Sequence, residues 1–507
     1  MKRQGVAVRS PPPKRARQAE EEETSTWAAC KAWVESCGGI VDGVGCSEEE
    51  ASRGVVVGDD GLREGACVLR IPLACCVLRA DVEASRIGAV ALAAAVWSEA
   101  REPLSAPAAD VALAFFVATD SRDAGAARAP YYATLPTYVD LPRYWPVEHL
   151  DALLGGSPVK ARIMDHRGGW RRDYDRVVRC APEEAWPTFE VYDWACAMVA
   201  TRSFTLAEGV DALVPLADLM NHSRDRETSY KVEDGAAVWR ATRDMAPRAA
   251  LHDTYGAKGN AQLLETYGFT MVANFEADGR SNDTRCLDLP GGRRVDLRVG
   301  TKVDAIIPFG ACLDAFRAAQ RPSDARAPSP DEEDFFDDEA GLGNDDDDDD
   351  DDDEDDDDDD EAKELWLRRV PVEIAALDAL VALIREELRG YALADPAAIL
   401  AGGALPPPPP GAADNFERRA RTSAALVLNE QATLRFYERA AERCAEVLKA
   451  EPDRAADLAG ALRVDAATAA AARVATSVSD RAHAAPVALA YLQMISCPAV
   501  AEAEPDN

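Results

Sequence analysis

The sequence lacks any Cys-x-x-Cys pair, although it contains 12 cysteines in 507 residues. Cys75 and Cys76 are adjacent, and the other cysteines are scattered along the chain. This spacing is typical neither of a zinc module nor of a disulfide framework. We therefore expect no metal site, and we expect a reducing compartment.

Long apolar runs are also missing. No stretch reaches the roughly 18 consecutive apolar residues of a membrane helix. The first residues lack the apolar core of about 7–15 residues that a secretory signal needs. The hydrophobic fraction is 47%, so the chain can still form a globular core. Its length corresponds to about two or three domains of roughly 150 residues each.

Positive charge is scarce. The formal net charge is −35, and residues 331–361 hold 24 acidic side chains and no Lys or Arg, which leaves about −11 for the rest of the chain. A nucleic-acid groove and an anionic membrane both require a basic face, so we expect neither as a partner. Because like charges at this density repel one another, the acidic segment is predicted to be a disordered loop.

The first 24 residues are polar, charged and rich in proline, which predicts a disordered tail. Within this tail, residues 11–17 read Pro-Pro-Pro-Lys-Arg-Ala-Arg. A basic cluster of this kind is typical of nuclear import signals, so the expected location is the nucleus, the cytoplasm or both. The alternative is a solvated basic tail that is followed by the acidic residues Glu20 to Glu23.

The first half of the chain begins with strands and continues with helices. Segments at 54–57 and 66–72 are separated by glycines and predict a small β-meander. Residues from about 80 to 200 read as helices that are inserted after these strands. Two further strands with alternating polarity are expected at 286–289 and 294–299.

The second half is predicted to be helical over residues 301–450, interrupted by the acidic loop 331–361. An amphipathic helix is expected to begin at Pro371, with apolar residues on one face. Residues 451–507 form an Ala-rich tail with weak helical character.

Two blocks rich in Asn, His, Tyr and Gly lie between Leu213 and Phe269. In the first block, Asp218, Asn221 and His222 follow an apolar run. Their hydrogen-bond donors and acceptors suit the purine edge of an adenine nucleoside and the charged ends of a methionine moiety. The alternative for Asp and Asn at such positions is a helix cap.

The second block contains Tyr255 after a strand-like segment and Tyr267 at the end of a short helix. Asn260 is expected to cap this helix and Gly268 to terminate it. The two tyrosines are either ordinary core residues or the walls of an aromatic cavity. In such a cavity, ring faces attract a positive sulfonium or ammonium group.

Three motifs of this chain, in their order along the sequence, resemble those of SET-domain methyltransferases. They are Pro-Leu-Ala-Asp-Leu-Met-Asn-His-Ser, Tyr-Gly-x-Lys-x-Asn and Tyr-Gly-Phe. The similarity is to the branch that contains the Rubisco large-subunit lysine methyltransferase and the actin-histidine methyltransferase. The segment Asn429-Glu430-Gln431-Ala432-Thr433-Leu434 resembles the family's Gly-Glu-Lys-x-x-Leu. The resemblance implies an α+β fold. A β-rich SET domain would span residues 25–300, with a pseudoknot and a helical insert at about 80–200, and an all-α substrate-binding domain would span 301–450.

The resemblance also implies roles for single residues. Tyr255 would be the catalytic tyrosine, and it would contact the substrate together with Phe204. The segment through Asn221 and His222 would be threaded by the later block, which forms the pseudoknot. S-adenosylmethionine would be bound by Arg202, Asp218, Leu219, Met220, Asn221, His222 and Tyr267.

The expected reaction is methyl transfer to a lysine of a protein substrate. In the actin-histidine enzyme, an Asn stands two residues after the motif arginine and a Trp precedes the motif aspartate. Phe204 and Ala217 occupy these positions here, which favours lysine. The alternatives are a histidine acceptor and a non-catalytic scaffold whose acidic run binds basic proteins. The sequence departs from the family at Gly259, at residues 247–250 and near Gly54, where no residue stands out as the family's cofactor-contacting arginine.

Overall fold

The computed structural model describes residues 26–47, 53–207, 210–276, 280–299, 302–320, 355–410 and 415–450. The chain divides into two compact units. The first comprises the chain up to Trp145, Ala161–Lys258 and Gln262–Phe269, and the second comprises Pro146–Lys160, Gly259–Ala261 and the chain from Thr270 onward. The predicted tails 1–24 and 451–507 lie outside the described residues. The domain boundaries expected from the sequence stay predictions.

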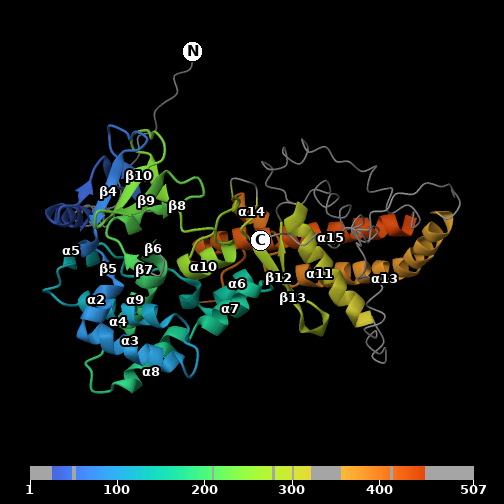
Figure 1. The fold of residues 1–507 in the computed structure, drawn as a ribbon, viewed down its shortest axis with the longest axis horizontal. Helices are drawn as coiled ribbons and strands as arrows, with labels where there is room; N and C mark the ends of the chain where they lie inside the picture. The colour runs from blue at the N-terminus through green and yellow to red at the C-terminus, as the bar shows by residue number, and fades with distance from the viewer. Residues whose placement is uncertain are drawn as a thin grey trace, which may run out of the picture. The chain divides into compact units, whose positions relative to one another are not determined.

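Three small sheets form the β-rich part of the first unit, with the strand orders β1-β4-β10-β9, β2-β3-β11-β8 and β5-β7-β6. Figure 1 shows β4, β10 and β9 side by side. The strands are β1 (Ile40–Val41), β2 (Val44–Cys46), β3 (Val55–Val57), β4 (Cys67–Pro72), β5 (Val77–Leu78), β6 (Ser203–Ala207), β7 (Val210–Leu213), β8 (Asn221–His222), β9 (Thr228–Glu233), β10 (Ala236–Ala241) and β11 (Ala250–Asp253).

The sheets combine strands from distant parts of the chain. β4 buries Val68, Leu69 and Ile71 completely and pairs with β10, which follows the helical insert. β3 pairs with β2 and with β11. The predicted β-meander of 54–57 and 66–72 is therefore wrong. Both strands form, but they lie in different sheets because each pairs with a strand from beyond the insert.

The predicted helical insert is confirmed. At its centre, the ring of Phe115 on α4 lies 4.3 Å from that of Tyr192 and 4.8 Å from that of Trp186. Residues 111–118 of α4 are all buried, which explains why this helix lacks a polar face. A further helix spans residues 26–36. The insert contributes α2 (Arg79–Ala84), α3 (Arg86–Glu99), α4 (Ala108–Asp120), α5 (Ala129–Tyr132), α7 (Pro158–His166), α8 (Gly169–Cys180) and α9 (Phe189–Arg202). Residues 146–160 of the insert, which include the start of α7, belong to the second unit.

The second unit is mostly helical. Leu377, Leu380 and Ile384, on the predicted apolar face, are fully buried. Figure 1 shows α13 alongside α11 and α15, which it contacts. The elements are α6 (Val147–Leu154), β12 (Thr284–Asp288), β13 (Arg294–Arg298), α11 (Lys302–Gln320), α13 (Asp355–Arg389), α14 (Pro396–Leu400) and α15 (Phe416–Ala450), and α10 (Asn260–Tyr267) has residues in both units.

Helix α13 differs from the sequence prediction at its start. It begins at Asp355 and not at Pro371, so it includes the end of the acidic segment 331–361, whose earlier residues lie outside the described ranges. Pro371 lies inside the helix and removes one backbone hydrogen bond. The helix continues through this position, where Val370 and Glu373 are both buried.

Candidate active site

Two segments that are distant in the sequence meet within the first unit. β8 pairs in parallel with β11, so that His252 lies opposite Asn221 and Asp253 lies opposite His222. Parallel neighbours need a long connection, and here the connection contains β9 and β10. The pairing brings the two sequence blocks together, as the predicted pseudoknot requires.

Tyr255, the predicted catalytic residue, is held against the β8 segment at two points. Its backbone N–H donates to Nδ1 of His222 over 3.0 Å, and its hydroxyl donates to the carbonyl of Met220 over 3.0 Å. Because Nδ1 of His222 accepts, the proton of the neutral imidazole belongs on Nε2. Burial raises the pKa of Tyr255 to about 12, so this hydroxyl keeps its proton at neutral pH.

Four rings surround this point, and we call them the aromatic cluster: His222, Tyr255, Tyr267 and Phe269. The Tyr255 ring stacks on His222 with centroids 5.2 Å apart, and its centroid lies 4.8 Å from that of Tyr267. The Phe269 ring lies 6.0 to 6.2 Å from each of the other three. Phe269 was not among the predicted site residues, although the Tyr-Gly-Phe motif contains it.

The helix before this cluster ends as predicted but does not begin as predicted. Gly268 has a φ of +77°, and a Cβ at this position would lie 2.8 Å from the carbonyl of Asp140, so glycine fits both the turn and the contact. Asn260 is not a helix cap. Its side chain accepts from Met271 N and donates to Met271 O and to Asp283, because it is buried and must satisfy its amide.

Asp218 is the centre of a buried charged group. Its Oδ2 accepts from the Tyr131 hydroxyl over 3.0 Å and from Nη1 of Arg202 over 3.3 Å, and its backbone carbonyl accepts from the same Nη1 over 2.9 Å. Desolvation raises the pKa of Asp218, and Arg202 opposes this shift. Oδ1 of Asp218 and Nε of Arg202 are buried without a hydrogen-bond partner among the described residues. Tyr131, which comes from the insert, was not among the predicted site residues.

Arg53 is a further site residue that the sequence analysis missed. Its carbonyl accepts from Nδ2 of Asn221 over 3.2 Å, and its positive charge, like that of Arg202, opposes the rise in the pKa of Asp218 that burial causes. Its Nε is buried and has no partner in the described part of the chain. A Cβ on Gly54 would lie 2.6 Å from Nδ2 of Asn221, so the neighbouring glycine was the available signal.

The remaining residues of the first block shape the backbone of the site. Asp218 does not cap a helix, and the Asn221 side chain bonds Arg53, so the cap alternative is wrong for both. Leu219 and Met220 are buried apolar residues. Leu216 has a φ of 65°, a conformation that is costly for a residue other than glycine and that concentrates at functional sites.

Phe204, a predicted substrate contact, belongs to a second aromatic group. Its ring lies 5.8 Å from Tyr230 and 5.4 Å from Trp239. Nε1 of Trp239 donates to Oδ2 of Asp253 over 2.8 Å, two residues before Tyr255. The ring contacts of Phe204 are thus with this group and not with the aromatic cluster.

No profile of a known protein family matches the chain. Single proteins do match it. The actin-histidine N-methyltransferase of Danio rerio is 27% identical over 180 residues, which cover 32% of this chain and 30% of that protein. The N-lysine methyltransferase SETD6 of Homo sapiens is 27% identical over 195 residues, 35% of this chain and 40% of that protein. The matched region therefore spans less than half the length of these relatives.

Solved structures match over a larger part of the chain. The structure of Rubisco LSMT bound to AdoMet has a TM-score of 0.60 and 17% identity, and the match covers 88% of this chain and 99% of that one. The SET domain of LSMT bound to lysine and AdoHcy has a TM-score of 0.59 and 16% identity, over 88% and 98% of the two chains. The chain has the SET-domain fold. The resemblance and the fold class inferred from the sequence are confirmed.

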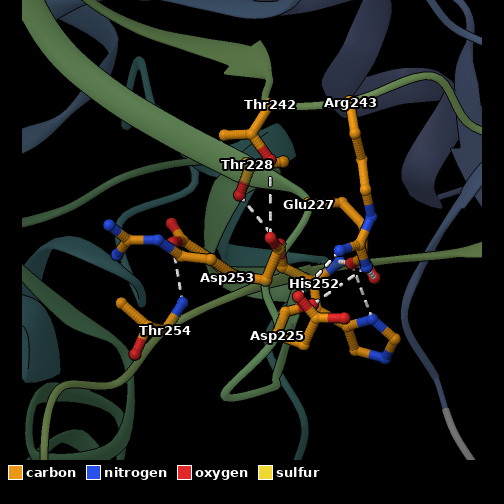
Figure 2. A network of polar contacts seen from close by, with 9 residues as sticks. Asp225, Glu227, Thr228, Thr242, Arg243, His252, Asp253 and Thr254 are labelled. Carbon is orange, nitrogen blue, oxygen red and sulfur yellow. Dashed lines mark hydrogen bonds and ion pairs between the residues drawn. The ribbon is translucent and has the colours of Figure 1, made fainter. Parts of the chain in front are cut away.

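Within this SET domain, a polar network holds β11 just before Tyr255 (Figure 2). The Glu227 carboxylate accepts from the backbone N–H of His252 over 3.0 Å and lies 2.9 Å from Nδ1 of the same residue. Arg243 binds both Glu227 and Asp225, at 2.8 and 2.7 Å. The network fixes the strand from which Tyr255 extends.

The loop that follows Tyr255 in the SET domain is also held in place. Nη1 of Arg224 donates to the carbonyl of Gly256, and Nη2 donates to that of Lys258, each over 2.6 Å. Among the described residues, no three His, Cys, Asp or Glu side chains lie together so that they could bind a metal ion. No helix in the same ranges has the length and apolar character that a bilayer crossing demands.

Proposed function

We propose that this SET-domain protein is an S-adenosylmethionine-dependent methyltransferase that modifies a lysine side chain of a protein substrate. The main support for the proposal is the pairing of β8 with β11. It brings the Tyr255 hydroxyl to the Met220 carbonyl, to which it donates a hydrogen bond, and Met220 lies in the segment that also contains the buried Asp218. The relatives named as N-lysine and actin-histidine methyltransferases support a protein as the acceptor.

The residues present fit the proposed cofactor. The ammonium group and the hydroxyl groups of S-adenosylmethionine each require a hydrogen-bond acceptor. Oδ1 of Asp218 is a buried acceptor without a partner among the described residues. A carboxylate requires donors, which Nε of Arg53 and Nε of Arg202 offer. The ring faces of the aromatic cluster attract cations. When bound, S-adenosylmethionine would supply a methyl group on a positively charged sulfur.

The protein's part in the reaction is to position and desolvate the acceptor. A lysine must be neutral to act as a nucleophile, and its ordinary pKa is about 10.4. Burial and a neighbouring positive charge both lower that pKa. Tyr255, whose hydroxyl stays protonated, orients the amine and is not a base. Alignment of the two reacting groups provides most of the expected reduction of the barrier.

A lysine acceptor is favoured by two apolar positions. Ala217 is fully buried, and Phe204 packs on Tyr230 and Trp239. Apolar walls suit the alkyl stem of lysine, whereas a histidine acceptor needs a polar group to fix one of its ring nitrogens. A histidine acceptor is retained as the second candidate because a histidine methyltransferase is among the relatives.

The test replaces Tyr255 by Phe. We expect binding of S-adenosylmethionine, measured by calorimetry, to change by less than about threefold, because the rings remain. Transfer of labelled methyl groups into a protein extract should fall by about 100-fold or more, because the acceptor loses its alignment. Tyr174→Phe is the matched control, since it also removes a hydroxyl that donates to a backbone carbonyl, that of Pro187 at 2.7 Å.

The outcomes separate the candidate functions. Tandem mass spectrometry of the extract identifies the methylated residue, and methyl groups on histidine alone would replace the lysine proposal by its alternative. Methyl transfer that survives Tyr255→Phe unchanged contradicts the role of Tyr255. A wild-type protein that does not bind S-adenosylmethionine, but captures basic proteins through residues 331–361, would be the scaffold.

A further inference from the structure

Helix α3 presents an apolar face to solvent. Val90, Ala93 and Trp97 recur at helical spacing, and Val96 and Trp97 are each 53% exposed. An exposed surface of a helix normally carries polar side chains, and a contiguous apolar patch marks a binding surface more often than a lone exposed residue does. The face lies in the insert, well away from β8 in the view of Figure 1.

This face is one wall of a groove between α3 and α8, with a volume of about 700 Å³. That volume lies within the range of ligand sites, roughly 300–1,000 Å³. The floor is made of aliphatic side chains, Trp97 and the end of α8. The lining residues are Val90, Ala93, Ala94, Trp97, Ser98, Arg101, Glu102, Arg176, Arg179, Cys180 and Ala181.

The rim of the groove is basic. The Arg101 guanidinium lies 3.5 Å from the centre of the Trp97 ring, and its Nη1 donates to the Trp97 carbonyl over 2.7 Å. Arg176 is engaged by the Glu102 carboxylate and by the Pro103 carbonyl. Arg101 and Arg179 have no carboxylate partner in the described part of the chain. Two guanidinium groups therefore border an apolar floor.

The charge and shape of the groove select one kind of occupant. Guanidinium groups bind carboxylates with paired hydrogen bonds. Arg101 covers one face of the Trp97 ring, and the remainder of this half-exposed ring can pack against another aromatic side chain. A nucleic acid would need a longer basic track, and the remainder of the chain is acidic. We propose that this groove binds an acidic peptide segment of a partner protein, with an aromatic side chain on Trp97 and carboxylates on Arg101 and Arg179.

The probe is a fluorescent peptide, Asp-Glu-Glu-Asp-Phe-Phe-Asp-Asp-Glu, titrated against the full chain with anisotropy as the readout. The chain's own residues 331–339 have this sequence. The titration is therefore repeated on a chain with Phe335→Ser and Phe336→Ser, which cannot compete through the same rings. Two further peptides carry Ser for both Phe residues, or Lys for every acidic residue.

We expect saturable binding of the acidic Phe peptide and at least tenfold weaker binding of the other two. Trp97→Ala and Arg179→Glu should each weaken binding by about tenfold or more, as expected for central contacts of an interface. Tyr138→Ala, at a residue that is also 53% exposed, and Arg122→Glu should change it by less than twofold. Thermal melting of all four variants checks that they fold.

Three results would overturn the proposal. The first is the absence of saturable binding to the wild-type chain: if both forms fail to bind there is no such site, and if only the chain with Phe335→Ser and Phe336→Ser binds, the occupant is the chain's own segment and not a partner. The second is equal loss of affinity in Trp97→Ala and Tyr138→Ala, which would show that the groove is not the binding site. The third is binding to anionic lipid vesicles in preference to the peptide. Because the readout is peptide binding, it does not depend on whether methyl transfer is confirmed.

Discussion

Glu430 is predicted to make the stability of the second unit depend on pH near neutrality. It lies on α15 and is 4% exposed. Its Oε1 accepts from the Ser157 hydroxyl over 2.9 Å and its Oε2 accepts from the Tyr391 hydroxyl over 3.0 Å. Burial raises the pKa of Glu430 from 4.5 to about 7, Arg285 opposes the shift, and Asp283 adds to it.

The sign of the effect follows from the direction of the pKa shift. The folded state holds the proton more tightly than the unfolded state, so this carboxyl stabilises the fold below pH 4.5, and the contribution is lost as the pH rises to about 7. The difference between 4.5 and about 7 corresponds to about 3 kcal/mol, at roughly 1.4 kcal/mol for each pH unit. Above about pH 7 no further loss is expected from this group.

Glu430→Gln isolates this effect, because the amide has the shape of the protonated acid and does not titrate. Urea unfolding is measured between pH 4.5 and 8 by hydrogen exchange of peptides from α15, which reports on the second unit alone. We expect the free energy of unfolding of the wild type to fall by about 3 kcal/mol relative to that of Glu430→Gln as the pH rises over this range. Glu417→Gln, on the same helix with a side chain that is 68% exposed, is the control and should follow the wild type.

Parallel pH profiles of wild type and Glu430→Gln would refute the reasoning, because the carboxyl would then titrate alike in both states. Two neighbours of Glu430 keep their charge over this range. Arg285 is paired with Glu387, and Tyr391 has its pKa raised by burial, so neither changes charge between pH 4.5 and 8.

Three further predictions follow from the site and the sequence. Asp218→Asn should weaken binding of S-adenosylmethionine by about tenfold or more in calorimetry, because it removes the buried negative charge that pairs with Arg202. Gly54→Ala should destabilise the first unit by no more than about 1 kcal/mol in urea unfolding, because its Cβ displaces only the end of the exposed Asn221 side chain and its hydrogen bond to Arg53; Gly45→Ala, which has open space, should have no effect. We also propose that residues 11–17 direct nuclear import, so their deletion should shift a tagged protein to the cytoplasm in microscopy; an unchanged distribution contradicts this.

Local features of the fold could be predicted where the chemistry is local. The end of α10 at Gly268 follows from the freedom of glycine to adopt a positive φ, and the buried face of α13 follows from its apolar spacing. The neighbours of β3 and of β4 could not be predicted in this way. β3 pairs with β11 and β4 pairs with β10, and both partners come from beyond the insert. Periodicity indicates that a strand forms but does not identify its neighbour.

The candidate site shows the same division. The motif resemblance predicted that His222 and Tyr255 belong to one site, and the structure places them in contact. Tyr131 and Arg53 were missed because neither stands within the motif blocks. Tyr131 is on a short helix of the insert, where its hydroxyl reaches Asp218 only through the tertiary fold. Arg53 precedes Gly54, which indicates a close backbone contact, but the sequence does not identify Asn221 as the residue contacted.

The unpaired atoms around Asp218 indicate why these residues are present at all. A buried hydroxyl that has no partner among the described residues, such as that of Ser121, costs a modest amount of free energy. An unpaired atom of a charged group costs more when the atom is buried. Three such atoms, which have no partner among the described residues, occur near one another on Asp218, Arg202 and Arg53. Folding alone would favour apolar side chains of similar volume at such positions. Charged groups with unused donors and acceptors are instead what recognition of a charged ligand requires, and this favours a binding role for the group over a purely structural one.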